Sequence, residues 1–419
     1  MILSGCQRHL IPTPNLHADS EIDPFADVPP ELATSTVDLL YVTDRKPEGD
    51  GENDPGDVEY GYGRSFSVAV GSCVVEIGNG VPWEELVKAS RVKKRGGTLP
   101  LRMRTITEQF RFPRPPPPIS VNKGGEVEAT SRYVVARQAA VDALHDELRR
   151  RLAVTPRKEA YVFVHGYANT FRKAAFRMAE MWHFLGREGV PILYSWPAGS
   201  PGLLRGYTHD RESGEFTIFH LKEFLKALAA CPELDTVHVI AHSRGTDVAM
   251  TALREIIVAA RNRGDDPQVV LKIGNVIMAA PDVDLDVSGQ RFAAEQLYDG
   301  FELLTMYVSK NDRAIGMAEW LFASPRRIGK IELKELNAGE MARTRLMPNA
   351  DIVDARVRTD YTGHGYFLSN PAVFSDVILV LRYDRTPGAE HGRPLTEVFP
   401  GYYILDDRYP QHAAPLPKK

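Results

Sequence analysis

Short apolar runs alternate with segments of helical periodicity through the second half of the chain. Residues 132–152 place apolar side chains three and four positions apart, which predicts a helix. The runs that follow are uniformly apolar, as expected of strands that are buried on both faces. The alternation predicts a mostly parallel, doubly wound α/β sheet with helices on both faces. The runs lie at residues 160–164, 191–194, 237–241, 276–279 and 303–308, and the helical segments at residues 171–186, 209–230 and 247–261.

The first 130 residues have a different pattern. Residues 37–42 and 65–77 predict strands, while the Gly-, Asp- and Glu-rich residues 45–64 predict a loop between them. Pro113 and the prolines at 115–118 favour an extended polyproline conformation, which suits a junction. We expect four regions, which are an N-terminal tether or arm at residues 1–35, a β-containing extension packing on the core at 36–130, the α/β domain at 131–389 and a C-terminal tail at 390–419.

Composition limits the class of protein without specifying its chemistry. The 419 residues are 43% hydrophobic, which is enough for a large core. Lys and Arg total 51 against 55 Asp and Glu, so the net charge of -4 does not favour nucleic acid as a partner. No apolar run approaches the roughly 20 residues of a membrane-spanning helix. The three cysteines, Cys6, Cys73 and Cys231, do not make a disulfide framework or a closed zinc site.

Ser243 is the strongest candidate for a catalytic residue. The apolar run 237–241 leads directly into the turn 242–245, and a helical segment follows. This order of strand, sharp turn and helix is typical of the nucleophile elbow G-x-S-x-G, here with Ala241 at the first position. Small residues let the turn approach the neighbouring strand, and the start of a helix favours negative charge near the hydroxyl. The plainer interpretation is a serine that caps the helix.

A serine nucleophile also needs a base and an acid, and in this fold both follow it along the chain. The acid should come after a late strand. Asp312 follows the predicted strand 303–308 and is the first candidate. Asp282 follows the preceding strand and is the alternative acid. With Asp284 and Asp286 it also suggests a weak cation site, although the spacing does not match an EF-hand loop.

His364 is the candidate base. It is one of three histidines that follow the candidate acid, and the other two lie in unsuitable segments. His391 is in a Gly-, Arg- and Glu-rich stretch, and His412 is in a proline-rich tail. Glycines on both sides of His364 let the backbone place an imidazole in a cleft. We expect its ring to take the serine proton and return it to the leaving group. The alternative is an ordinary histidine of a surface loop.

A developing oxyanion needs two hydrogen-bond donors. The amide of Arg244, directly after the nucleophile, should provide one of them. The amide of Tyr167, in the loop 165–169, should provide the other. His165 precedes the serine and is therefore not expected to be the base. With Trp196, at the end of the next strand, it is a candidate for the wall of the substrate pocket; a hydrogen bond within the loop and a packed aromatic are the alternatives.

Five segments share a pattern with a known family. They read Phe163-Val164-His165-Gly166-Tyr167-Ala168-Asn169-Thr170-Phe171, Tyr194-Ser195-Trp196-Pro197, Ala241-His242-Ser243-Arg244-Gly245, Ala280-Pro281-Asp282-Val283-Asp284, and Tyr307-Val308-Ser309 ending at Asn311-Asp312. Together they resemble an uncharacterised bacterial α/β-hydrolase family that is defined as a domain of unknown function.

This resemblance spans roughly residues 130–385, and the segment Tyr41-Val42-Thr43-Asp44-Arg45 is similar to the extension that usually precedes it. It implies an α/β-hydrolase fold and esterase- or lipase-like hydrolysis, and it implies no particular substrate. Arg244 departs from the family, in which methionine is commoner at this position. The polarity of the pocket therefore stays open.

Cys6 is a candidate for lipidation. Leu3-Ser4-Gly5-Cys6 resembles the lipobox of bacterial lipoproteins, and many members of the family look like lipoproteins. The apolar segment before it is shorter than the roughly 7–15 residues of a signal-peptide core. We expect a lipoprotein of the cell envelope, associated with the membrane through Cys6, if the true start lies upstream. Otherwise we expect a cytoplasmic protein.

The sequence thus predicts a serine hydrolase that cleaves carboxylic esters through an acyl-enzyme on Ser243 and needs no cofactor. The expected substrates are small-molecule or lipid esters, and hydrolysis, acyl transfer and thioester cleavage all use this machinery. The alternative is a catalytically inactive protein of the same fold that acts as a binding or scaffold protein of the cell envelope. A metal hydrolase built on the aspartates 282, 284 and 286 is a third hypothesis.

Overall fold

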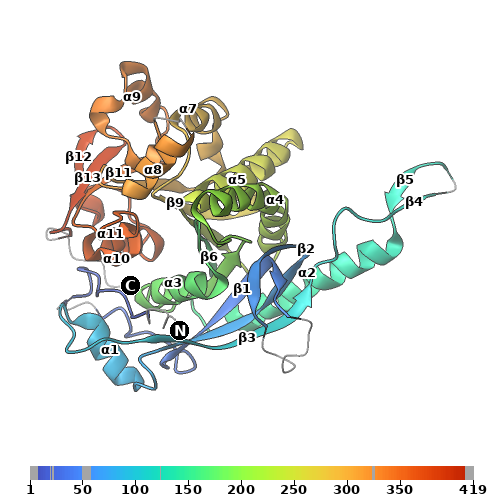
Figure 1. Cartoon of the computed structure of the whole chain (residues 1–419), viewed down its shortest axis with the longest axis horizontal. Helices are drawn as coiled ribbons and strands as arrows, with labels where there is room; N and C mark the ends of the chain where they lie inside the picture. Colours follow the sequence, from blue (N-terminus) through green and yellow to red (C-terminus); the bar gives the residue numbers. More distant parts are fainter. Residues whose placement is uncertain are drawn as a thin grey trace.

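One mixed sheet runs through the molecule (Figure 1). The computed structural model describes residues 8–18, 20, 23–49, 58–122, 124–322 and 326–410. The strands of this sheet are β1 (Thr36–Pro47), β2 (Tyr60–Ile77), β3 (Leu101–Arg111), β6 (Glu159–Val164), β7 (Val190–Ser195), β8 (Thr236–His242), β9 (Ile273–Ala279), β10 (Leu303–Val308), β11 (Ala350–Arg356), β12 (Thr396–Phe399) and β13 (Tyr402–Asp406). Within the described residues, its eleven strands are ordered β12-β13-β11-β10-β9-β8-β6-β7-β1-β2-β3. The strands from β13 to β1 in this order are parallel, while β2 and β12 run antiparallel to their neighbours.

Helices cover both faces of the sheet, which confirms the predicted α/β-hydrolase architecture. Alternate side chains of β6 show the division, because Val162 and Val164 pack on one face while Tyr161 and Phe163 pack on the other. The first face is covered by α2 (Ser131–Leu152), α4 (Leu203–Ala229) and α5 (Arg244–Asn262), and the second by α1 (Trp83–Arg91), α3 (Phe171–Phe184), α10 (Tyr366–Ser369) and α11 (Pro371–Leu381).

The remaining short elements connect the late strands. They are α6 (Pro267–Leu271), α7 (Leu285–Ser288), α8 (Arg313–Phe322), α9 (Ala338–Thr344), a π-helix (Gly289–Ala294), and 3-10 helices at Leu297–Gly300, Ile328–Lys330, Leu333–Glu335 and Ala389–His391. Among the described helices, none combines the length and the apolar content needed to cross a bilayer.

The two ends of the chain are more closely built into the fold than the sequence predicts. Residues 36–47, expected to belong to an extension packed on the core, instead form β1 inside the main sheet, where Thr43 pairs with Ser195 of β7. The expected tether at 1–35 contains buried Leu10 and Leu16, which pack against the second face. The segment packs against the body because it carries apolar side chains among its prolines, and leaving those side chains in water costs free energy.

The expected C-terminal tail also contains sheet structure. The strand β13 pairs in parallel with β11, and β12 closes this edge of the sheet. Arg393 anchors the segment, since its buried guanidinium pairs with Asp376 at 2.8 Å and with Asp351 at 2.9 Å. A charged residue in a polar stretch reads as solvent-exposed in the sequence, so these buried partners were not predictable.

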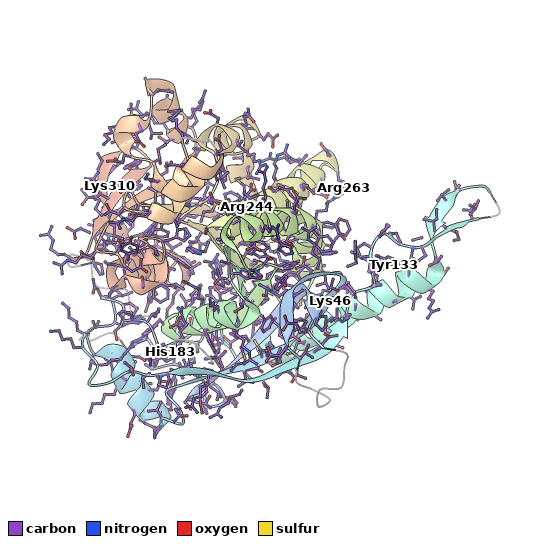
Figure 2. All side chains as sticks on the ribbon, viewed as in Figure 1. Lys46, Tyr133, His183, Arg244, Arg263 and Lys310 are labelled. Atoms are coloured by element: carbon purple, nitrogen blue, oxygen red, sulfur yellow. The ribbon has the colours of Figure 1, made fainter. Side chains whose placement is uncertain are left out.

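A narrow arm projects from this body (Figure 1). It consists of the hairpin β4 (Ile119–Val121) and β5 (Val127–Ala129) together with the first turns of α2. Tyr133, labelled in Figure 2, lies in the first turn of α2, at the end of the helix that follows the hairpin. The prolines that predicted a junction lie at its base, between β3 and the hairpin.

The strand order creates a crevice at one edge of the sheet. β6 lies between β7 and β8, because the chain passes from β6 to β7 and then crosses back through α4 to β8. At such a point the connections leave in opposite directions, and ligands of open α/β sheets bind there, outside the carboxyl ends of the strands. The loops that follow β6 and β8 therefore face the same space.

Candidate active site

Ser243 is a single residue between the end of β8 and the start of α5. Its backbone has φ 55° and ψ -127°, a region that residues other than glycine rarely adopt, at a cost of roughly 1–3 kcal/mol. Hydrogen bonds on both sides hold this conformation. The Ser243 amide donates to Ala279 O at 2.9 Å, and the Thr246 amide donates to Ser243 O at 3.0 Å. The strained turn presents the side chain at the carboxyl edge of the sheet, as a nucleophile elbow does.

Two glycines permit the close approach of the elbow to β6. A Cβ atom on Gly245 would clash with the carbonyl oxygen of His165, so α5 could not start this close to the strand. A Cβ atom on Gly166 would lie 2.7 Å from Ser243 Cβ. The second contact places the backbone of the loop after β6 directly beside the candidate nucleophile.

Ser243 occupies the N-cap position of α5, as the alternative interpretation requires, but its side chain forms no capping hydrogen bond with the described amides of the helix. The hydroxyl is therefore available for another partner at the sheet edge. Only 5% of the residue is exposed, so little of it contacts solvent.

Asp312 and His364 are brought together by the structure. Asp312 lies four residues beyond β10 and is fully buried. Its Oδ1 accepts a hydrogen bond from the Ile315 amide at 2.9 Å, and its Oδ2 accepts one from His364 Nδ1 at 2.7 Å. Gly363, with φ 68°, passes so close to the carbonyl of Asn311 that a larger residue would clash. The loop geometry therefore fixes the histidine against the carboxylate.

His242 connects this pair to the elbow. Its Nε2 donates to the His364 carbonyl at 3.2 Å, and the two rings are 4.8 Å apart. Since His242 directly precedes Ser243, His364 lies in the neighbourhood of the candidate nucleophile. Among the described hydrogen bonds, none joins the Ser243 hydroxyl to the His364 ring. Such bonds often form only when substrate closes the site.

His242 itself is not suited to be the base. Its ring is buried and stacked on Phe367, with centroids 4.7 Å apart. Burial, followed by the nearby His364, holds the pKa of His242 well below its usual value. His364 differs, because 19% of its side chain is exposed and its Nδ1 meets a carboxylate.

Asp282, the alternative acid, has other partners. Its Oδ1 pairs with Arg327 Nη1, and its Oδ2 accepts a hydrogen bond from Tyr207 at 2.9 Å. Asp284 caps α7 by accepting a hydrogen bond from the Asp286 amide at 2.9 Å. The structure therefore does not bring Asp282 to a histidine. Among the described residues, no group of three or more His, Cys, Asp or Glu side chains forms a metal-binding cluster.

The two expected oxyanion donors are next to residues that adjoin Ser243 or belong to its turn, since Arg244 follows the serine and Tyr167 follows Gly166. Arg244 opens α5, where helix geometry leaves the first amides without an intrahelical acceptor. Figure 2 shows Arg244 near the centre of the molecule, and its side chain turns to Asp247 with an ion pair of 2.9 Å. Tyr167 follows Gly166 in the loop after β6. Asn169 holds this loop, because its Nδ2 donates to the carbonyls of Gly166 and Tyr167 at 3.2 and 3.0 Å.

The prediction that His165 and Trp196 line a substrate pocket is wrong. Both side chains are completely buried, and their rings stack on each other with centroids 5.3 Å apart. Trp196 Nε1 also donates to the His165 carbonyl at 2.6 Å. The two aromatics lie behind the loop and support it. A residue type at a strand end does not reveal which way its side chain turns.

Sequence reasoning also missed polar residues that the site brings together. Tyr207 on α4 reaches Asp282, and Arg327 reaches the same carboxylate from the segment between α8 and α9. Neither residue belongs to a recognisable motif, so the sequence offers no signal for them. The remaining two cysteines within the described residues, Cys73 and Cys231, are free and buried. The lipidation candidate Cys6 lies outside the described residues.

Comparison with known proteins agrees with this geometry. A family model described as "Alpha/beta hydrolase of unknown function (DUF900)" matches residues 140–382, which is more than half of the chain. The match contains the elbow, the acid–base pair and both loops of the crevice. No curated protein matches the chain. The resemblance seen in the sequence is thus confirmed, and the chain belongs to this family of α/β hydrolases of unknown function.

Proposed function

We propose that the protein is a serine hydrolase that cleaves carboxylic esters through an acyl-enzyme on Ser243. The observation that carries this proposal is the 2.7 Å hydrogen bond from His364 Nδ1 to the buried Asp312 carboxylate, close to a strained serine turn. The three residue types also follow one another along the chain in the order that α/β hydrolases use.

The hydrogen bond determines which nitrogen of the imidazole acts. Because Nδ1–H of His364 donates to Asp312, Nε2 is the acceptor in the neutral ring. In the first step Nε2 takes the Ser243 proton while Oγ attacks the acyl carbon. The imidazolium then gives that proton to the leaving alkoxide, and Asp312 stabilises the positive charge in between. A water molecule, activated by the same base, releases the acid product.

The tetrahedral intermediate carries its negative charge on the former carbonyl oxygen. The amides of Arg244 and Tyr167 are the donors for this oxyanion in our proposal. The close approach of Gly166 to the serine supports it, since Tyr167 is the next residue of that loop and Arg244 directly follows Ser243. One such donor typically contributes about 2.7–4 kcal/mol to the stability of the transition state.

The surroundings of the serine favour small esters over long acyl chains. Tyr167 belongs to the loop beside Ser243 and its ring lies 5.1 Å from that of Tyr207, while the charged side chain of Arg244 directly follows the serine. A wall of aromatic and charged groups suits a compact, partly polar substrate. A series of p-nitrophenyl esters of increasing chain length tests this part, and we expect the highest kcat/KM with the shortest acyl groups.

Labelling with a fluorophosphonate probe tests the nucleophile. We expect the wild type to be labelled and Ser243→Ala to be neither labelled nor active, because the probe needs an activated serine. Ser288→Ala is the matched control. Its hydroxyl is buried and has no hydrogen-bond partner among the described residues, so its loss should change neither labelling nor folding. A wild type that resists the probe, or equal labelling of Ser243→Ala, would contradict the proposal and favour an inactive scaffold.

A further inference from the structure

Arg45, at the carboxyl end of β1, has its guanidinium buried among neutral acceptors. Nε donates to Ser195 Oγ at 2.8 Å, and Nη1 donates to the carbonyls of Gly61 and Ala198, also at 2.8 Å each. Nη2 donates to the carbonyl of Asn169 at 2.8 Å. Arg45 is only 1% exposed, and burial lowers its pKa to about 10. A buried charge is costly unless its hydrogen bonds are satisfied. The burial of Arg45 therefore indicates that its hydrogen bonds serve a specific purpose.

Two of these acceptors, the carbonyls of Asn169 and Ala198, belong to two loops at the candidate site, while Gly61 lies in β2 and Ser195 ends β7. One loop, residues 165–169, follows β6, and the other, residues 196–199, follows β7. Asp210 of α4 joins the same two loops through their amides. Its carboxylate accepts from the amide of Ala168 at 3.0 Å and from that of Gly199 at 3.1 Å. The buried cation of Arg45 thus binds carbonyl oxygens of the two loops, and the buried carboxylate of Asp210 binds their amides.

Arg45 also sets the tautomer of His165. Its Nη2 lies 3.3 Å from His165 Nε2, and a guanidinium has only donors, so Nε2 must be the acceptor. Burial, followed by the charge of Arg45, holds the pKa of His165 well below its usual value, so the ring is neutral. The single ring proton therefore resides on Nδ1. From there it is donated to the carbonyl of Gly166 at 3.0 Å.

The carbonyl of Gly166 in turn determines where the Tyr167 amide points. The Gly166–Tyr167 peptide is planar and trans, so its N–H lies opposite its C=O. His165 Nδ1 and Asn169 Nδ2 both hold that C=O, at 3.0 and 3.2 Å. This peptide is also the part of the loop that approaches Ser243.

We propose that Arg45 is a positioning residue that, through His165, orients the Tyr167 amide toward the oxyanion formed at Ser243. The inference rests on the proposed serine-hydrolase function. It assigns part of the site to a strand outside residues 140–382, the region matched by the family model. Arg45 does not touch the reacting atoms, and it acts by holding a loop that does.

Kinetics of the full chain test the proposal. We expect Arg45→Met to lower kcat by about 100-fold, the loss typical of one oxyanion donor, with KM changed less than about threefold. Arg45→Lys should retain an intermediate kcat, because an ammonium group replaces only some of the hydrogen bonds. The rate at which a fluorophosphonate labels Ser243 should fall in parallel, since its phosphoryl oxygen occupies the same position.

Arg187→Met is the matched control for a general loss of stability. Arg187 is also fully buried, and it donates to the carbonyls of Leu32, Thr34 and Thr36 at 2.7, 2.7 and 3.1 Å. It holds the N-terminal segment far from the elbow. We expect Arg187→Met to lower the midpoint of thermal unfolding as Arg45→Met does, while its kcat stays within about threefold of the wild-type value. If Arg45→Met and Arg187→Met have equal kcat, Arg45 has no positioning role.

A measurement of the tautomer separates this inference from the proposed function. In the wild type, the imidazole ¹⁵N shifts of His165, assigned by their loss in His165→Gln, should show a neutral ring protonated at Nδ1. A ring protonated at Nε2 would overturn the inference even if Ser243 is the nucleophile. Conversely, an unlabelled Ser243 with a ring protonated at Nδ1 would reject the esterase function and the oxyanion role that rests on it, while the hydrogen bonds from Arg45 through His165 to the Gly166 carbonyl would stand. Since this readout needs no variant of Arg45, it stands even if Arg45→Met fails to fold.

Discussion

The carboxyl ends of β9 and β10 are neighbours, and each is followed by a buried aspartate. Asp282 comes after β9 and Asp312 after β10, and both carboxylates are almost inaccessible to water. Their partners differ. Asp312 accepts from His364, whereas Asp282 pairs with Arg327. An arginine stays protonated at all ordinary pH values, but a histidine gains and loses its proton near neutrality.

This difference separates a carboxylate with a structural partner from one that stabilises an imidazolium in the proposed mechanism. Next to Arg327 the charge of Asp282 is permanently neutralised, and the pair ties the segment between α8 and α9 to the strand end. Next to His364 the charge of Asp312 is available whenever the imidazole takes up a proton. Position after a parallel strand is the same for both, so the partner determines the role.

The largest effect that we expect comes from Asp312→Asn. It should lower kcat by about 10⁴-fold, because an amide no longer favours the Nδ1–H tautomer of His364 and cannot stabilise the imidazolium. The side chain keeps its size, so the fold should persist, as circular dichroism and thermal unfolding can verify. Unchanged turnover in a folded Asp312→Asn protein would remove Asp312 from the proposed triad.

Asp282→Asn should act on stability instead. Removing one partner of a buried ion pair leaves the other charge uncompensated, which typically lowers the free energy of unfolding by about 3–5 kcal/mol. Urea denaturation measures this loss, and turnover of the folded protein should stay within about tenfold. Adding Arg327→Met should recover part of the stability, because the unpaired charge is then gone. If Asp282→Asn stops turnover without loss of stability, the roles of the two aspartates are reversed.

The smallest effect that we expect concerns His17, a buried histidine without a carboxylate partner among the described residues. His17 is buried between Phe25 and Phe184, and its ring nitrogens have no hydrogen-bond partner among the described residues. Burial, followed by nearby arginines, lowers the pKa of His17 to about 3, while in the unfolded chain it is about 6.5.

The sign of its pH dependence follows from proton uptake. As pH falls from about 6.5 toward 3, the unfolded chain binds a proton at His17 that the folded state does not, so the free energy of unfolding decreases. One proton contributes at most about 1.4 kcal/mol per pH unit. Urea denaturation between pH 7 and 5 should therefore show a shallower slope for His17→Phe than for the wild type. Parallel curves for the two proteins would show that His17 does not contribute.

The sequence predicted the parts of the fold and site that depend on local patterns. Uniformly apolar runs placed the central strands, since both faces of these strands are buried. Chain order after Ser243 placed Asp312 and His364, and the structure brings these two together. Membership of the hydrolase family was recognisable for the same reason, because its motifs are short and continuous.

Features that depend on distant partners could not be predicted. The position of β1 inside the sheet follows from β7, which lies far along the chain. The burial of His165 and Trp196 depends on how their rings stack behind a loop. The ion pair of Asp282 requires Arg327, in a segment without a motif. In each case the residue types are compatible with several environments, and only three-dimensional packing selects one.

The place of β1 in the sheet has a consequence for the order of folding. Thr43 Oγ1 donates to the carbonyl of Ser195, a partner 152 residues further along the chain. Pairings across so long a separation form slowly, whereas β1, β2 and β3 are successive antiparallel neighbours that can associate early during synthesis. The meander can join the parallel strands only after β7 has been synthesised. The pairing of β1 with β7 also brings Arg45 to the loops that follow β6 and β7, so the first strand reaches the candidate site only through a neighbour far along the chain.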